Sequence, residues 1–303
     1  MMDVSVVIVN YNVKELVLQS LETLFRYNKA CSLEVFVVDN HSSDGSAEAI
    51  RNRFPEVHLI ENTFNAGFPG ANNQAFALSR GRYVFMLNPD TEFSDDALVK
   101  LVHYLDAHPE VGLAGPRLLN SDGSYQASVW RYPSLKGIFL EMLYLKSLLG
   151  FKNYADQDKT KPFEAESFSG AAILFRKEVM ENIGVLDEQL FWIEDVDYCY
   201  RAKHAGYTLM YYPYAAIKHH IGQSAKKNYN ITVCNQIVNK IKFFKKYHPG
   251  LPWLTVVILS FGEVMAKLLV FTLLSPFNSI YARKARAYVY TLPRVFNPPQ
   301  GMK

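Results

Sequence analysis

The sequence contains two groups of acidic residues that could support acid–base or metal-assisted chemistry. Glu194, Asp195 and Asp197 place three carboxylates within a very short segment, and a further carboxylate, Asp90, lies far upstream. Burying so many like charges is unfavourable unless they bind a cation, hold an arginine or act as a base. The two groups together therefore predict a metal-dependent group-transfer site.

Alternating strand and helix patterns predict the scaffold that positions these carboxylates. Short apolar, β-branched runs are typical of buried parallel strands, and apolar residues at helical spacing lie between them. The expected strands are residues 4–9, 33–38, 57–60 and 83–87, and the expected helices are 13–25 (with Asn12 as N-cap), 46–54 and 70–79. This order predicts an α/β fold with a mainly parallel central sheet flanked by helices.

Polar side chains follow three of these strands directly. Asn10 and Asn12 come after the first strand, Asp39 after the second, and Asp90 after the strand at 83–87. Ligands of open α/β sheets bind beyond the carboxyl ends of the strands. We therefore expect these residues to gather at one ligand site.

The second half of the domain has a different pattern. Residues 120–123 read Asn-Ser-Asp-Gly, which predicts a hairpin turn, and residues 168–176 predict a strand. Residues 195–204 predict a helix, on whose surface Asp197 and Arg201 are spaced to pair.

The C-terminal region differs from the rest in charge. Residues 226–303 carry twelve Lys or Arg against one acid, Glu263, whereas residues 1–225 have a net charge near −8. This asymmetry indicates an anionic partner for the tail. It also divides the chain into a domain at 1–225 and a basic, helical C-terminal region at 226–303.

Within that region, residues 251–277 are almost wholly apolar apart from Glu263 and Lys267. Charges at the centre of a bilayer are costly, so we favour a helix in the membrane interface over a spanning helix. Burial in a core or a homodimer contact is the remaining alternative. Flanking basic residues would meet anionic headgroups.

The cysteines and the N-terminus give an expected location. Three cysteines form neither a metal-ligand spacing nor an even disulfide framework, and the first residues predict a strand rather than a signal peptide. We therefore expect a cytoplasmic protein, peripherally associated with the inner face of the cell membrane.

Four motifs in order resemble those of family 2 glycosyltransferases, which have the GT-A fold. They are Val37–Ser46, Asn65–Asn73, Leu87–Asp90 and the Glu194-Asp195 pair, and the similarity covers about residues 3–222. The bacterial rhamnosyltransferase-like branch is the most similar. The resemblance implies inverting transfer of a sugar, from dTDP-rhamnose or a UDP-sugar, to a hydroxyl of a glycan or polyprenyl-linked glycolipid during cell-surface polysaccharide synthesis.

The resemblance also assigns site residues. Nucleotide binding falls to Asn10, Asn12, Asp39, Asn65, Gly67, Asn72 and Asp90, and Asp90 and His219 are the expected ligands of Mg²⁺ or Mn²⁺. Asp195 is the expected general base, and Ser169, Gly170, Trp192 and Glu194 face the acceptor. Each of the turn, loop and aromatic residues has a structural alternative as a turn, cap or packing residue. Asn88 stands where the family usually has a second acid, which weakens the predicted metal site.

Two other functions compete with sugar transfer as interpretations of the sequence. A non-catalytic sugar-nucleotide-binding or scaffolding protein on the same fold is supported by Asn88 in the metal motif. Nucleic-acid binding is not expected, because the basic residues flank an apolar segment rather than forming a groove-binding motif. Neither the dinucleotide-binding nor the P-loop glycine motif is present.

Overall fold

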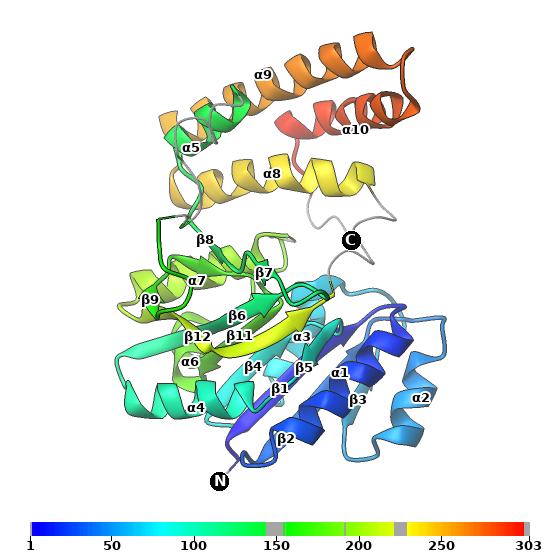
Figure 1. The fold of residues 1–303 in the computed structure, drawn as a ribbon. Coiled ribbons are helices and arrows are strands. Elements are labelled where there is room, and N and C mark those ends of the chain that lie inside the picture. Colours follow the sequence, from blue (N-terminus) through cyan, green and yellow to red (C-terminus); the bar gives the residue numbers. More distant parts are fainter. Residues whose placement is uncertain (1, 144–153, 155, 191, 221–228, 300–303) are drawn as a thin grey trace.

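The computed structural model describes residues 2–143, 154, 156–190, 192–220 and 229–299. It shows an α/β body with a stack of helices at one end (Figure 1). The predicted α/β class is confirmed, and the mixed, mostly parallel sheet is that of the GT-A fold.

Strands and helices alternate along the first part of the chain, and long helices follow in the C-terminal region. In chain order they are β1 (Val4–Asn10), α1 (Lys14–Tyr27), β2 (Leu33–Asp39), α2 (Ser46–Arg53), β3 (His58–Glu61), α3 (Gly67–Phe76), β4 (Tyr83–Leu87), β5 (Thr91–Phe93), α4 (Ala97–Ala107), β6 (Val111–Leu119), β7 (Tyr125–Gln126), β8 (Val129–Trp130), α5 (Leu135–Met142), β9 (Phe163–Glu164), β10 (Ser167–Phe168), β11 (Ala172–Arg176), α6 (Lys177–Ile183), α7 (Glu194–His204), β12 (Thr208–His219), α8 (Tyr229–Tyr247), α9 (Leu251–Leu274) and α10 (Ser279–Phe296).

The main sheet has the strand order β3-β2-β1-β4-β11-β6-β12-β5. Strands β3, β2, β1 and β4 are parallel, β11 is antiparallel to both β4 and β6, and β12 runs parallel to β6. The carboxyl ends of β1, β2 and β4 therefore meet at one edge, which brings the predicted polar residues together.

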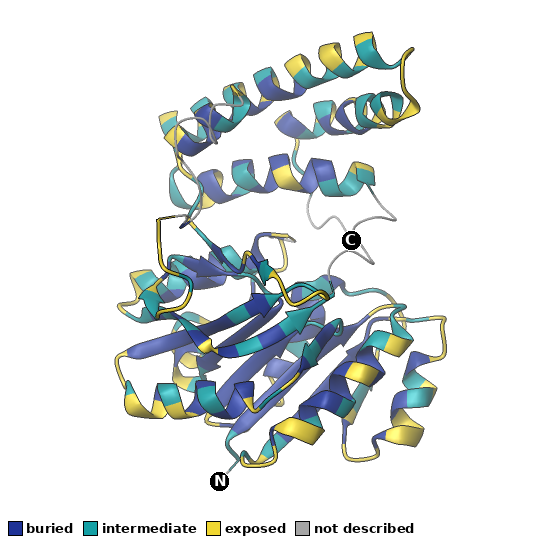
Figure 2. Cartoon of the chain, viewed as in Figure 1, coloured by how far each residue is buried: buried dark blue, intermediate teal, exposed yellow. Residues whose placement is uncertain are grey.

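Both faces of the sheet are covered, so its strands read as continuous apolar runs rather than alternating ones. One core packs α1, α2 and α4 against the sheet through residues such as Val6 and Leu21. The other packs α3, α6 and α7 through residues such as Val7 and Tyr198. Figure 2 shows the resulting buried interior of the sheet.

A third core belongs to the stacked helices α8, α9 and α10. It also includes Ile138 of α5 and two residues next to α7, Leu190 and Ile193. The helical unit is therefore packed on the body of the protein and includes a segment from the middle of the chain. The expected boundary between residues 225 and 226 lies outside the described residues.

Four local expectations need correction. Helix α1 begins at Lys14 without a side-chain cap from Asn12, which instead adopts φ 54° and accepts a hydrogen bond from the Ser43 amide at 2.8 Å. Helix α3 begins at Gly67 rather than at residue 70. The strand expected at 168–176 is interrupted, because residues 169–171 separate β10, which pairs with β8 in a small second sheet, from β11 of the main sheet. Asp197 is fully buried rather than on a helix surface.

The two charged residues of helix α9 lie on its packed side, next to buried valines such as Val264. Glu263 is 4% exposed and pairs with Lys267 on the side that packs against the other helices. Its outer side exposes Leu251, Leu254, Ile258, Phe261, Met265, Leu269 and Leu273, which recur at helical spacing (Figure 2). Among the described residues, α9 is the helix with the length and hydropathy needed to cross a bilayer, a criterion that many soluble core helices also meet.

Candidate active site

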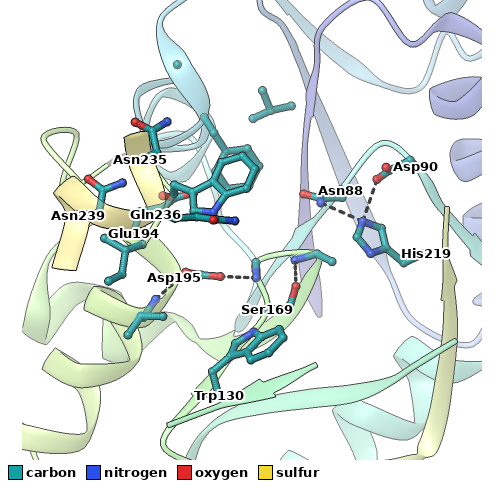
Figure 3. Close-up of a pocket in the computed structure, with 18 of the residues that line it drawn as sticks. Asn88, Asp90, Trp130, Ser169, Glu194, Asp195, His219, Asn235, Gln236 and Asn239 are labelled. Carbon is teal, nitrogen blue, oxygen red and sulfur yellow. Dashed lines mark hydrogen bonds and ion pairs between the residues drawn. The ribbon is translucent and has the colours of Figure 1, made fainter. Parts of the chain in front are cut away.

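A pocket of about 860 Å³ lies between the carboxyl edge of the sheet, the start of α7 and helix α8. Nine of the predicted site residues line it: Asn65, Gly67, Asp90, Ser169, Gly170, Trp192, Glu194, Asp195 and His219. Figure 3 shows Asp195 and Ser169 with the α8 amides on one side and Asp90 with His219 on the other. The sequence motifs thus converge on one cavity, although they come from distant parts of the chain.

Asn10, Asn12 and Asp39 build a turn behind this lining. Asn10 Nδ2 donates to Asp39 Oδ1 at 2.7 Å, and the Ser42 amide donates to Asp39 Oδ2 at 2.9 Å. Asp39 is 3% exposed, so both interactions are protected from water. A carboxylate that accepts several short hydrogen bonds holds its loop rigidly. The structure gives Asp39 this turn-forming role, and its contact with a base stays a prediction.

The glycine-containing loop before α3 is held by an amide that the sequence motifs did not assign. Asn40 Nδ2 donates to Asn65 Oδ1 at 2.8 Å, and Asn40 Oδ1 accepts from the Ala66 amide at 2.8 Å. Gly67 has φ 77°, a left-handed conformation that favours glycine. Asn72, by contrast, is fully buried and donates to the Phe68 carbonyl within α3. It does not line the pocket, and its nucleotide role stays a prediction.

Asp90 and His219 are brought together by the pairing of β5 with the end of β12. His219 Nε2 lies 3.2 Å from Asp90 Oδ1 and 3.3 Å from Asn88 Nδ2. The two side chains are mostly buried and face the pocket (Figure 3). Their oxygen and nitrogen atoms are suitable ligands for a divalent cation. Within the residues that the structure describes, no cluster of three His, Cys, Asp or Glu side chains surrounds a single point.

Gln126 holds the His219 ring through its Nδ1 atom. Gln126 Nε2 donates to Asn120 Oδ1 at 3.0 Å and to the His219 carbonyl at 2.9 Å, so its Oε1 must face His219 Nδ1, 2.7 Å away. An oxygen acceptor at that position requires the proton on Nδ1. Nε2 is then the ring nitrogen that faces Asp90 and the pocket, which is the position of a metal-ligating nitrogen.

Asp195 lies in the first turn of α7 and is oriented by two backbone amides. The Gly170 amide donates to Oδ2 and the Val196 amide donates to Oδ1, each at 2.7 Å. Burial raises the pKa of Asp195 to about 6, against the opposing effect of these hydrogen bonds. A carboxylate with this pKa is ionised at neutral pH and still accepts a proton readily.

Glu194 differs from Asp195 although it is the preceding residue. Burial raises the pKa of Glu194 to about 8, and the nearby charge of Asp195 adds to the effect. Its Oε2 is buried and has no hydrogen-bond partner among the described residues. Glu194 is therefore mainly neutral at pH 7, which leaves the negative charge of the pair on Asp195.

The acceptor-side residues predicted from sequence surround Asp195. Gly170 leaves room beside the carboxylate, since a Cβ at this position would lie 3.4 Å from Asp195 Oδ2. Trp192 is 43% exposed and lines the pocket, so it is not a core residue. Its φ of 86° is unusual for a bulky residue, and such strained conformations cluster at functional sites.

The structure adds pocket residues that the sequence motifs did not reveal. Trp130 and the α8 residues Asn235, Gln236 and Asn239 all line the cavity. The α8 amides have a sequence signal, because their spacing places them on one helical face. Trp130 had none, because only the pairing of β8 with β10 places it near Asp195.

Comparison with known proteins defines the class. Residues 5–184 match the sequence model of glycosyl transferase family 2. The chain therefore belongs to this family and is a glycosyltransferase.

The individual relatives share about a quarter of their residues with this chain over the matched segments. The chain is 27% identical over 212 residues to N-acetylglucosaminyl-diphospho-decaprenol L-rhamnosyltransferase of Mycobacterium tuberculosis, covering 65% of this chain and 69% of the relative. It is 26% identical over 231 residues to the dTDP-rhamnosyl transferase RfbF of Shigella flexneri, covering 75% and 72%. The fold resembles that of a mannosyltransferase from Pyrobaculum calidifontis, with a TM-score of 0.58 and 17% identity over 97% of this chain and 87% of that one.

Proposed function

We propose that this glycosyltransferase moves a sugar, with inversion, from a nucleoside diphosphate donor to a hydroxyl of a glycan or polyprenyl-linked glycan. The observation that carries the proposal is the placement of Asp195. Its oxygens are fixed by the Gly170 and Val196 amides in a pocket whose other end holds Asp90 and His219. A base and a diphosphate-binding end within one cavity are what this reaction requires.

The proposed donor is dTDP-rhamnose or a UDP-sugar. Both relatives described above carry rhamnosyltransferase names, which supports a rhamnosyl donor. The turn formed by Asn10, Asn12 and Asp39 would hold the nucleoside, and the loop at Asn65 and Gly67 would lie along the diphosphate, since backbone amides at a helix start bind anions. Asp39 would accept from the base once the turn rearranges or through its remaining lone pairs.

Mg²⁺ or Mn²⁺ is the proposed cofactor. The side chains present fit such an ion in part: Asp90 would supply a carboxylate oxygen, and His219 would supply Nε2. Asn88 contributes no charge, so oxygens of the diphosphate and water would complete the shell. When bound, the cation would stabilise the negative charge that develops on the leaving diphosphate.

Asp195 performs the proton transfer in the proposed mechanism. It accepts the proton of the acceptor hydroxyl while that oxygen forms a bond to the anomeric carbon. The bond from that carbon to the diphosphate oxygen breaks, and the nucleoside diphosphate leaves with the electron pair. Attack from the face opposite the leaving group inverts the anomeric configuration. The Gly170 amide keeps the Asp195 carboxylate aimed at the acceptor throughout.

The outer face of α9 supports a membrane-associated acceptor. Seven apolar residues are exposed along it, whereas Glu263 and Lys267 lie on the packed side. We propose that α9 lies in the interface of the inner leaflet and that basic residues of α10, such as Arg283 and Arg286, contact anionic headgroups. This would place the protein at the cytoplasmic membrane surface, where a polyprenyl-linked acceptor is available.

Asn88 stands in place of the usual second acid of the metal motif, so metal-dependent nucleotide binding is the first property to test. Thermal-shift measurements with UDP, dTDP and GDP, each with Mn²⁺, Mg²⁺ or EDTA, test nucleotide binding directly, because a ligand of the native state raises its stability. We expect a metal-dependent rise with dTDP or UDP that is lost in Asp90→Asn. Absence of any shift would contradict the proposed donor site. Cleavage of the matching nucleotide-sugar then tests which sugar the donor carries.

A further inference from the structure

Helix α8 contributes three side-chain amides to the wall of the pocket. Asn235, Gln236 and Asn239 are spaced so that they lie on one face of the helix, and all three line the cavity (Figure 3). Gln236 is exposed, whereas Asn235 and Asn239 are 1% and 3% exposed. Buried amides are unfavourable inside a helical core unless their hydrogen bonds are satisfied, which indicates that this face binds polar groups.

The position of this face is fixed by contacts between α8 and the start of α7. Lys246 Nζ donates to Asp197 Oδ1 at 2.7 Å, and Tyr247 Oη donates to the same oxygen at 2.5 Å. Lys242 Nζ donates to the Gln189 carbonyl at 2.8 Å. The amides are thus held opposite the segment that carries Glu194 and Asp195, and a ligand entering the pocket meets both walls.

Two polar atoms in these walls have no hydrogen-bond partner among the described residues. Asn235 Nδ2 is an unsatisfied donor, and Glu194 Oε2 is an unsatisfied oxygen on the opposite wall. Both side chains are more than nine-tenths buried and line the pocket. Unsatisfied buried groups are rare in native proteins and indicate a missing ligand or water.

The charges around the amides determine which ligand fits. Lys240, the cation on this face, is already paired with Glu141 at 2.8 Å. Asp195 adds negative charge on the other wall, so a phosphate would be repelled here. A neutral sugar, in contrast, offers hydroxyl and acetamido groups to the amides and an apolar ring face to Trp130 and Trp192, which also line the pocket.

We propose that Asn235, Gln236 and Asn239 of α8 form a subsite for a neutral acceptor sugar, recognised through its hydroxyl and acetamido groups. This inference rests on the proposed transferase function and specifies the acceptor side of the same pocket. The family match ends at residue 184, so the subsite belongs to the part of the chain that is not shared through that match. The C-terminal region then selects the acceptor as well as contacting the membrane.

Tryptophan fluorescence of the full chain tests the subsite without requiring turnover. The sequence has three tryptophans, of which Trp130 and Trp192 line the pocket, so a Trp253→Phe background isolates their signal. The protein is kept in a detergent without a sugar headgroup and titrated with methyl N-acetyl-β-glucosaminide, methyl β-glucoside or N-acetylglucosamine 1-phosphate. The matched variants are Gln236→Ala, Asn239→Ala and Asn230→Ala, the last an exposed amide of α8 outside the pocket.

We expect saturable quenching by the neutral glycosides and weaker binding of the phosphorylated sugar. Gln236→Ala should raise the glycoside dissociation constant about tenfold, as loss of a well-formed hydrogen bond implies, and Asn239→Ala should act in the same direction. Asn230→Ala should match the parent protein. Equal dissociation constants for Gln236→Ala and Asn230→Ala, preference for the phosphorylated sugar, or no saturable quenching would overturn the subsite.

A parallel assay of nucleotide-sugar cleavage separates this inference from the proposed function. Glycoside binding that depends on Gln236, in a protein that cleaves no donor, would support the subsite and contradict the enzyme. Donor cleavage without Gln236-dependent glycoside binding would overturn the subsite and leave the enzyme intact.

Discussion

Lys246 Nζ lies 2.7 Å from Asp197 Oδ1 and thereby joins the C-terminal helices to the helix that carries Asp195. Asp197 is fully buried, and its other oxygen accepts from Arg201 Nε at 2.9 Å. The sequence predicted the Asp197–Arg201 pair from its spacing but placed it on a surface, because the partner from α8 lies far along the chain. The tail is thus anchored beside the proposed catalytic residue.

Replacing Asp197 with Asn should destabilise the protein by about 3 kcal/mol, because Arg201 and Lys246 would lose their common buried counter-ion. Urea unfolding followed by circular dichroism measures this change. Asp187→Asn, which removes the other carboxylate paired with Lys246 but a more exposed one, should cost less than about 1 kcal/mol. Equal losses of stability in the two variants would contradict Asp197 as the shared buried counter-ion of Arg201 and Lys246.

Glu194 should make the stability of the protein depend on pH. Its pKa is raised to about 8 by burial first and by Asp195 second, whereas an unfolded chain titrates near the ordinary value of 4.5. Between these values the native state binds more protons than the unfolded state, so the free energy of unfolding falls as pH rises. Glu194→Gln should remove much of this decline. The midpoint of urea unfolding, measured at intervals between pH 5 and pH 9 (about four units), provides the readout. Unfolding midpoints that fall equally with pH in the parent protein and in Glu194→Gln would contradict the raised pKa of Glu194.

Gln126 should control the affinity for the divalent cation although it does not touch the proposed ion. Gln126→Leu removes the acceptor that keeps the proton on His219 Nδ1, and such supporting residues typically change metal affinity about 10- to 100-fold. Gln126→Glu, which retains an acceptor oxygen, should recover most of that loss. Titration of Mn²⁺ against the nucleotide-induced thermal shift provides the readout. Unchanged Mn²⁺ dependence in Gln126→Leu would argue against His219 as a ligand.

The exposed face of α9 should bind anionic vesicles. Ile258 is 60% exposed on this face, and an aspartate there should weaken vesicle binding about tenfold or more, since insertion of a charge into the apolar interface is costly. Leu78→Asp is the matched control, because Leu78 is 52% exposed on the α/β body. Co-sedimentation with vesicles rich in phosphatidylglycerol measures both variants. Equal binding by the two would contradict an interfacial role for α9.

The sheet could be predicted because its strands are strong local signals. The runs that became β1 and β2 are rich in valine, and the run that became β4 is apolar and aromatic. The parallel arrangement of these strands then places their polar C-terminal neighbours together. Boundaries were less predictable. The segment at 169–171 reads as strand, yet it separates β10 from β11 where the Gly170 amide binds the Asp195 carboxylate, an interaction between residues far apart in sequence.

The site could be predicted only in part for the same reason. Asp90, Asp195 and His219 stood out because their motifs contain charged residues in a recognisable order, and the structure brings all three to one pocket. Gln126 and the amides of α8 are ordinary residues locally. They reach the site through the pairing of β7 with β6 and the packing of α8 beside α7, which no local pattern encodes.

Glycosyl transfer by Asp195→Asn tests the central claim most directly. The parent protein and the variant are assayed with dTDP-rhamnose and UDP-sugars, Mn²⁺ and a polyprenyl-linked glycan acceptor across a range of pH. The parent rate should fall as pH drops through about 6, where Asp195 becomes protonated, and the variant should lose about 10²- to 10⁴-fold in kcat. A variant that transfers sugar at the parent rate, with the same pH dependence, would contradict Asp195 as the base.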